Sequence, residues 1–162
     1  MSIGTKSLKK QNHELSNIDK QLQVLHNGVA DQNLESFSSK LKASNLFPLT
    51  TTGLDVFQIN MGKMCNQVCS HCHVDAGPDR KEIMTKETLQ QCLDAIKKSG
   101  INTVDLTGGA PEMNPHFRWF VEEAYKLGCK TIVRCNLTII VANKKYFDLP
   151  EFYKENELEI VS

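Results

Sequence analysis

Three cysteines within eight positions are the part of this sequence most able to do chemistry. Cys65, Cys69 and Cys72 form a C-x3-C-x2-C triplet directly after an apolar run. Iron–sulfur clusters are held by cysteine thiolates, because soft sulfur ligands match iron, and a closed four-iron cluster normally takes four of them. The triplet therefore predicts a [4Fe-4S] cluster in which one iron has no protein ligand and can bind a substrate or cofactor.

Three other uses of these cysteines stay open from the residues alone. The segment Cys69-Ser70-His71-Cys72-His73 also satisfies the C-x-x-C-H haem-attachment pattern, but haem leaves Cys65 without a role, and residues 1–10 lack the apolar segment of an export signal. Structural zinc can use the triplet with His71 or His73, although zinc ligands usually come as two separated pairs. A disulfide framework requires an oxidising compartment.

The composition fits a soluble globular protein without a charged partner. The 162 residues are 40% hydrophobic and 23% charged, which suits one core, and 19 basic residues balance 19 acidic ones. No charge excess favours nucleic acid or a membrane surface. The longest aliphatic run, residues 139–142, is far shorter than the roughly 20 residues of a membrane span. We therefore predict a cytoplasmic protein with neither kind of partner.

Two regions differ in character. Residues 1–45 are predicted to be a polar N-terminal leader with short helices, because apolar residues recur there at helical spacing. These residues are Leu15, Ile18, Leu22 and Leu25, and then Leu34, Phe37 and Leu41. A frayed leader over residues 1–30 fits the sequence nearly as well. Residues 46–162 are predicted to be the core domain.

Strand and helix patterns alternate through the core domain. Strands are predicted at residues 54–60, 101–106, 131–135 and 158–161. One helix is predicted from Thr85 as its cap to Gly100, a second from Asn114 as its cap to Gly128, and a looser one over residues 149–156. Repeated units of this kind predict an α/β fold with a parallel sheet, open or closed as a barrel, and ligands at the C-terminal ends of the strands.

The triplet and its surroundings resemble a known superfamily. In its spacing, residues 64–72 are similar to the radical S-adenosylmethionine (SAM) enzymes, in which the methionine part of SAM chelates the free iron. The resemblance implies that an electron from the cluster cleaves SAM to methionine and a 5′-deoxyadenosyl radical. It also implies a partial (β/α) barrel of six strand–helix units. This chain reaches about four strands, so we expect a truncated barrel, incomplete at the C-terminus, with an unpaired sheet edge.

The resemblance also suggests contacts to SAM. Gly108, Gly109 and Ala110 stand where these enzymes carry a Gly-Gly-Glu-Pro-like segment that holds the SAM amino group. Glycines let a ligand approach backbone carbonyl and amide groups, although an ordinary strand-to-helix turn uses them equally well. Here Ala110 replaces the acidic residue and Glu112 comes later, so we assign the role to the backbone.

Four further residues are candidates for SAM binding. Asn136 and Thr138, after the third strand, can hydrogen-bond the ribose or carboxylate of SAM, or act as a turn residue and a helix cap. Arg134 can point into the barrel and pair with the SAM carboxylate or with Glu112, or remain solvated. His71 occupies the position whose backbone usually meets adenine.

The remaining cysteines and loop charges receive structural interpretations. Cys92 is predicted to pack in a helix stripe, and Cys135 either packs in the core or faces the reaction space and binds a soft electrophile. The charged residues after the triplet sit at a turn, where such side chains are usually solvated, or they shape the cluster loop, and none is given a catalytic role. These are His73, Asp75, Asp79 and Arg80. No catalytic acid, base or nucleophile is predicted, because in radical chemistry the cofactor supplies the reactive species.

A narrower resemblance points to a reaction. Residues 58–80, 106–114 and 134–140 look like those of the arsenosugar-biosynthesis radical SAM proteins. This implies transfer of the deoxyadenosyl group to dimethylated trivalent arsenic, an electron donor such as a flavodoxin or ferredoxin, and a functional link to an arsenic methyltransferase. A radical SAM enzyme that modifies peptides or matures a cofactor is the alternative within the superfamily. A structural metal-binding or electron-transfer module is the non-enzymatic alternative.

Overall fold

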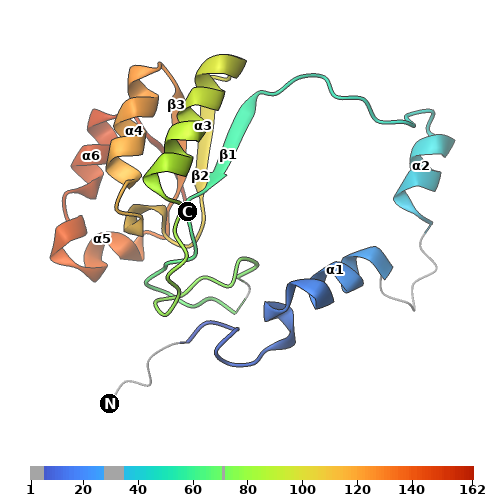
Figure 1. Cartoon of the computed structure of the whole chain (residues 1–162), viewed down its shortest axis with the longest axis horizontal. Coiled ribbons are helices and arrows are strands. Elements are labelled where there is room, and N and C mark those ends of the chain that lie inside the picture. Colours follow the sequence, from blue (N-terminus) through green and yellow to red (C-terminus); the bar gives the residue numbers. More distant parts are fainter. Residues whose placement is uncertain (1–5, 28–34, 71) are drawn as a thin grey trace. The chain divides into compact units, whose positions relative to one another are not determined.

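The computed structural model describes residues 6–27, 35–70 and 72–162 (Figure 1). The chain divides into two compact units, one made of Met1–Asn12 with Leu54–Ser162 and one made of His13–Gly53. The first unit carries the sheet and the cysteine triplet. The predicted domain boundary between residues 45 and 46 stays a prediction.

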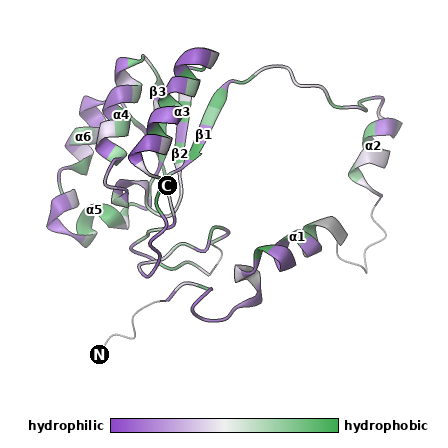
Figure 2. Cartoon of the chain, viewed as in Figure 1, coloured by the Kyte–Doolittle hydropathy of each residue, from purple (hydrophilic) through white to green (hydrophobic). Residues whose placement is uncertain are grey.

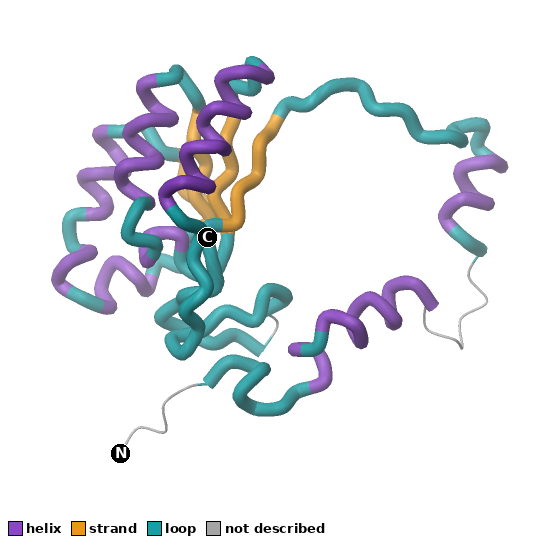
Figure 3. Tube along the Cα trace, viewed as in Figure 1, coloured by secondary structure: helices purple, strands orange, loops and turns teal. Residues whose placement is uncertain are grey.

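Four parallel strands form a single sheet in the first unit (Figure 3). They are β1 (Val56–Asn60), β2 (Thr103–Thr107), β3 (Lys130–Arg134) and β4 (Glu159–Val161). Their order in the sheet is their order in the chain, so each strand pairs in parallel with the next. Parallel neighbours require a crossover, and here every crossover contains helix. The predicted α/β fold, a partial (β/α) barrel, is confirmed.

Helices cover one face of this sheet, as Figure 1 shows for the three longest of them. These are α3 (Lys86–Ser99), α4 (Phe117–Lys126) and α6 (Leu149–Glu155). Shorter elements complete the crossovers, namely η2 (Pro111–Met113), α5 (Thr138–Ala142) and η3 (Lys144–Tyr146). The predicted strands and helices of the core are present, with ends that differ by a few residues.

The helix ends show which local signals are effective. Thr85 caps α3 by accepting a hydrogen bond from the Thr88 amide at 3.3 Å, and Gly100 ends it with a left-handed φ of 71°. The prediction that Asn114 caps α4 is wrong, because His116 is the cap residue. The side chain of Asn114 instead donates through Nδ2 to the Met61 carbonyl at 2.9 Å and to the Met84 carbonyl, just before α3, at 3.0 Å. It therefore ties two loops together.

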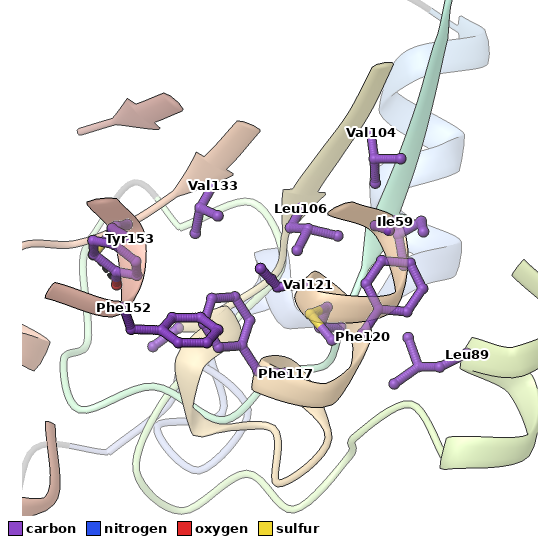
Figure 4. Packing of buried hydrophobic residues seen from close by; sticks show 14 of the residues in the cluster. Ile59, Leu89, Val104, Leu106, Phe117, Phe120, Val121, Val133, Phe152 and Tyr153 are labelled. Carbon is purple, nitrogen blue, oxygen red and sulfur yellow. Dashed lines mark hydrogen bonds between the residues drawn. The ribbon is translucent and has the colours of Figure 1, made fainter. Parts of the chain in front are cut away.

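The core lies between the sheet and the helices. Ile59, Leu106 and Val133 share one register across three strands and point toward the helices, with Phe120 and Val121 packed nearby (Figure 4). These five side chains are at most 2% exposed. Alternate residues of the same strands face the other way. Figure 2 shows β1 in hydrophobic colour, whereas much of α3 is hydrophilic, as expected for a helix with one buried stripe.

The second unit contains η1 (Glu14–Ser16), α1 (Ile18–Asn27) and α2 (Phe37–Ala43). Ser36 caps α2 by accepting a hydrogen bond from the Ser39 amide at 3.2 Å. The predicted pattern at Leu34 lies outside the described residues. None of the helices within the described ranges has the length and apolar content needed to cross a membrane.

The buried stripe of α4 generates a stability prediction. Phe120 is fully buried, so we expect Phe120→Ala to lower the free energy of unfolding by about 3–5 kcal/mol through lost burial and a cavity. Urea denaturation followed by circular dichroism measures this loss. Tyr125→Ala on the same helix is the control, because Tyr125 is 43% exposed and its truncation should cost below about 1 kcal/mol. An equal loss of unfolding free energy in both variants would show that the buried stripe does not hold α4 on the sheet.

Candidate functional site

The face of the sheet opposite the helices is polar. Gln58 and Asp105 stand in register on β1 and β2, and Arg134 ends β3 on the same face. Arg134 donates through Nε and Nη2 to both oxygens of Asp105 at 2.9–3.1 Å, and Gln58 donates to Asp105 Oδ2 at 2.8 Å. Burial opposes ionisation of Asp105, but these bonds outweigh it and lower the pKa of its carboxyl. The prediction that Arg134 pairs with Glu112 is therefore wrong.

A cavity of about 410 Å³ opens above this polar face. Its lining residues come from the strand ends and from the segment that follows the triplet. They are Gln58, Asn60, Thr107 and Arg134, with His73 and Val74. Ligands of parallel α/β sheets bind at the C-terminal strand ends, and the cavity has that position. Arg134 and the cysteine segment are therefore brought together at one place.

Backbone hydrogen bonds fix the cysteine loop, defined as residues 61–84, to the end of β2. The Gly109 amide donates to the Gly62 carbonyl at 2.9 Å, and the Ala110 amide donates to the Met64 carbonyl at 2.8 Å. A Cβ on Gly109 would lie 2.8 Å from the Met64 carbonyl carbon, and one on Gly108 would lie 2.6 Å from the Gly62 oxygen. Glycine is therefore required at both positions for the loop to approach this closely.

This arrangement narrows what the predicted SAM-binding segment can offer. The amides of Gly109 and Ala110 are occupied by the cysteine loop, although both carbonyl and amide groups were expected to be exposed to ligand. The carbonyl oxygens of Gly108 and Gly109 are the groups of this segment left for an ammonium ligand. The glycines have a second role that sequence reasoning missed, which is to hold the cysteine loop.

Three N–H groups donate hydrogen bonds to sulfur atoms of the triplet. Cys65 is buried, whereas Cys69 and Cys72 are partly exposed, and all six cysteines are free. Cys65 Sγ accepts hydrogen bonds from the Gln67 amide at 3.4 Å and Asn136 Nδ2 at 3.3 Å, and Cys72 Sγ accepts one from the Ala76 amide at 3.3 Å. Such bonds stabilise thiolate ligands and tune the potential of a cluster.

Burial raises the pKa of the Cys65 thiol, and the neighbouring Cys69 and Cys72 raise it further. The hydrogen bond from the Gln67 amide lowers this pKa but does not outweigh the burial. No three His, Cys, Asp or Glu side chains of the described residues converge on one point as for a single metal ion. A four-iron cluster takes each thiolate on a different iron, so its ligands need not converge in that way. The donor set, with its N–H···S bonds, fits a cluster, and ligation by the triplet stays a prediction.

Asn136 and Thr138 form a closed hydrogen-bonded ring with Asn66 of the cysteine loop. Asn66 donates to Thr138 Oγ1 at 2.8 Å, Thr138 donates to Asn136 Oδ1 at 2.8 Å, and Asn136 donates to Asn66 Oδ1 at 3.2 Å. The residue that caps α5 is Leu137, so Thr138 is not the cap. The ring joins the end of β3 to the loop beside Cys65. Contact of Asn136 and Thr138 with SAM stays a prediction, and His71 lies outside the described residues.

Cys135 lies in the core and does not face the cavity. Its side chain is 2% exposed, and its Sγ lies 3.6 Å from the Tyr153 hydroxyl, which donates to Glu112 Oε1 at 2.8 Å. Burial, with the nearby Glu112 carboxylate, raises the pKa of Cys135 to about 12. The thiol is therefore neutral and is not a ligand for a soft electrophile. Cys92 packs partly buried against the same core.

Two of the loop charges, for which solvation and a role in shaping the cluster loop were both open, are buried. Asp75 is 6% exposed and Arg80 7% exposed, and Arg80 Nη1 lies 2.5 Å from Asp75 Oδ2. Arg80 also bonds Glu82 through Nε and Nη2, and these hydrogen bonds lower the pKa of Glu82 to about 2. His73 is exposed, as expected. The pairing was not visible in the sequence, because turn residues of this type are usually solvated.

Comparison with known proteins agrees with this site. Residues 59–156 match the radical SAM superfamily. The chain is 24% identical over 113 residues to the antilisterial bacteriocin subtilosin biosynthesis protein AlbA of Bacillus subtilis (strain 168), covering 66% of this chain and 25% of that protein. It is 29% identical over 79 residues to a protein named probable GTP 3′,8-cyclase of Saccharolobus islandicus (strain M.14.25 / Kamchatka #1), covering 49% of this chain and 26% of that protein.

The chain thus spans about a quarter of the length of the curated relatives it matches. The matched region begins in β1 and ends just after α6, so it contains the cysteine triplet, the Gly108–Gly109 turn and all residues that line the polar cavity except Gln58. On these grounds the chain belongs to the radical SAM superfamily, whose members are enzymes that bind a [4Fe-4S] cluster and S-adenosylmethionine.

Proposed function

We propose that Cys65, Cys69 and Cys72 hold the cluster and that this chain transfers the deoxyadenosyl group of SAM to dimethylated trivalent arsenic. With one added electron, bound cluster and SAM supply methionine and a 5′-deoxyadenosyl radical. The observation that carries the ligand assignment is the set of N–H···S hydrogen bonds to Cys65 and Cys72. These donors suit a negative sulfur ligand better than a neutral thiol.

The Gly108–Gly109 turn and Arg134, which lines the cavity, offer groups for the amino-acid end of SAM. The carbonyl oxygens of Gly108 and Gly109 accept hydrogen bonds from its ammonium. Asp105 engages Nε and Nη2 of Arg134, which leaves Nη1 as a donor to the SAM carboxylate. Asp105 holds the guanidinium in place and raises the pKa of Arg134, so the positive charge is kept. Asn136 and Thr138 are assigned to the ribose or carboxylate of SAM, and the backbone of His71 is assigned to adenine.

The arsenic step balances without an external oxidant. In the product, C5′ of SAM would be bonded to arsenic through the lone pair of dimethylarsinous acid. The arsenic centre would release its hydroxyl proton to solvent and one electron, which a bound cluster would take back, so arsenic would rise from the trivalent to the pentavalent state. SAM supplies the carbon group and leaves as methionine. Support for this substrate is the resemblance of residues 58–80, 106–114 and 134–140 to the arsenosugar family.

The proposal includes partners. Dimethylated arsenic is made by methyl transfer, so an arsenic methyltransferase supplies the substrate. A flavodoxin or ferredoxin supplies the electron that starts SAM cleavage. The free cysteines and an oxygen-sensitive cluster suit a reducing compartment, so the proposed location is the cytoplasm.

A second candidate is peptide modification. It is favoured by the likeness to the subtilosin biosynthesis protein, which covers 66% of this chain. Cys135 is buried, and among the described residues no cysteine lines the cavity, so no thiol is available there to bind arsenic. A product assay therefore has to separate the two substrates.

The ligand assignment predicts iron loss from cysteine variants. After anaerobic reconstitution, Cys65→Ala, Cys69→Ala and Cys72→Ala should each fall from about four irons per chain to below about one. Iron and sulfide analysis measures the loss, with circular dichroism as a check on folding. Cys92→Ala on α3 is the control and should keep its iron. Full iron in any triplet variant would remove that cysteine from the ligand set.

The substrate assignment predicts an arsenic-containing product. Reconstituted protein with SAM, dithionite and dimethylarsinous acid should give deoxyadenosine carrying a dimethylarsinoyl group, identified by mass spectrometry. Parallel reactions contain a peptide panel or GTP in place of arsenic. A modified peptide or a cyclised nucleotide without the arsenic product would favour the second candidate or another superfamily reaction. Free deoxyadenosine alone in every reaction would retain SAM cleavage and reject all three substrates.

The role of Arg134 predicts weaker SAM binding in Arg134→Lys. Lysine keeps the charge but loses the planar fork, and a hydrogen bond to a charged group is worth about 1.5–3 kcal/mol, so affinity should fall about tenfold or more. Equilibrium dialysis with labelled SAM measures the affinity. Arg118→Lys is the matched control, because Arg118 makes an exposed ion pair with Asp148 at 2.7 Å on the helix side. Equal affinities of the two variants would contradict the assignment.

A further inference from the structure

A short N-terminal segment is bound to the cysteine loop. We define the N-terminal turn as residues 7–11, in which the Gln11 amide donates to the Ser7 carbonyl at 3.1 Å. The Ser7 amide and hydroxyl donate to Asp79 at 2.9 and 2.8 Å. The Leu8 and Lys9 amides donate to the two oxygens of Asp75 at 2.6 and 3.1 Å. Two carboxylates thus cap the unpaired amides at the start of one helical turn.

The contact is buried. Ser7 has no exposed surface and Leu8 is 9% exposed, although neither belongs to a named helix or strand. The Asp75 carboxylate and the Arg80 guanidinium are also buried and pair with each other. A buried carboxylate is stable only when its oxygens are hydrogen-bonded, and the N-terminal turn supplies two of the donors. The buried carboxylate of Asp75 is therefore stabilised by Leu8 and Lys9, which lie 67 and 66 positions before it in the chain.

Asp75 is coupled to one cysteine of the triplet. The Asp75 amide donates to the Cys72 carbonyl at 3.2 Å, and the next amide, of Ala76, donates to Cys72 Sγ at 3.3 Å. Asp75 has a left-handed φ of 51°, which a non-glycine residue adopts only when its surroundings hold it. The bonds from the N-terminal turn and Arg80 provide that hold. The Ala76 amide is thereby aimed at the sulfur.

A second contact connects the N-terminal turn to Cys65. The Gly77 carbonyl accepts the Cys65 amide at 3.2 Å. Gly77 lies against the turn, since a Cβ added there would be 3.5 Å from Ser7 Cβ. The two compact units of the chain also link the N-terminal turn to the cysteine loop. Met1–Asn12 belongs to the same unit as the sheet, whereas His13–Gly53 does not.

We propose that Ser7, Leu8 and Lys9 are positioning residues of the cluster site, which act through Asp75 on the sulfur of Cys72. The inference rests on the proposed role of Cys72 as a cluster ligand. Removing the turn deprives the Asp75 carboxylate of two hydrogen bonds and frees its backbone, so the Ala76 amide is no longer held toward the sulfur. Outer partners of metal ligands typically change metal affinity about 10–100-fold, and a loss of that size is expected here.

The first test uses the metal-free protein and does not depend on the cluster. A deletion of residues 2–12 is compared with a deletion of residues 2–5, which keeps Ser7, Leu8 and Lys9. Hydrogen exchange followed by mass spectrometry should show faster exchange of the peptide around residues 72–77 only in the longer deletion, by about tenfold. Unchanged exchange in both would overturn the proposal, because the turn would not order the loop.

The second test measures the coupling to the cluster. After anaerobic reconstitution, iron release to a chelator should be about tenfold faster in the longer deletion than in the shorter one. The point variant Leu8→Pro, which lacks the Leu8 amide hydrogen, should show the same direction, with Lys6→Pro as its matched control. These variants also serve if the longer deletion does not fold.

The outcomes separate the two proposals. Equal release rates in all variants, with altered exchange at residues 72–77, would overturn the coupling to the cluster and leave the cluster itself intact. Failure of the unaltered chain to take up iron would instead reject the proposed cluster ligands, whatever the exchange data show. Faster exchange together with faster release supports the positioning role.

Discussion

The contact between the end of β2 and the cysteine loop is the constraint on which the site depends. Two amides, of Gly109 and Ala110, donate to carbonyls on either side of Lys63, and there is no room for a side chain at Gly109. Together with the hydrogen-bonded ring at Asn66 and the bonds from Asn114, this contact holds the loop that carries the three cysteines against the sheet. Because the loop is tied at this point, Cys65 Sγ lies within hydrogen-bonding distance of Asn136. Asn136 follows β3 and lies 71 positions later in the chain.

Successive side chains along each strand point to opposite faces of the sheet, so one face packs in the core and the other lines the cavity. One set of side chains, such as Leu106 and Val133, packs under the helices and supplies the stability of the unit. The other set, represented by Asp105 and Arg134, is polar and lines the cavity. A one-residue change of register would exchange the two sets, so the packing of the core also specifies which charges reach the ligand side.

Much of the fold follows from local patterns, and much of the site does not. Strand and helix spans were predictable from periodicity, and Thr85 and Gly100 from capping chemistry, because these signals lie within a few residues of one another. The triplet was visible from spacing alone. The pairing of Arg134 with Asp105 and the burial of Asp75 were not predicted, since both depend on groups 29 and 67 positions away that only the fold brings near.

The three thiols of the triplet are unequally shielded, which determines how the site meets oxygen. Cys65 is 6% exposed, while Cys69 and Cys72 are open to solvent in part. Oxidation of a thiol follows its accessibility, so a sulfenic acid or a disulfide forms first at the outer pair. Both products are reversed by cellular thiols, whereas further oxidation to the sulfinic acid is not. Cys65, the inner of the three proposed ligands, would therefore be the thiol that stays reduced longest.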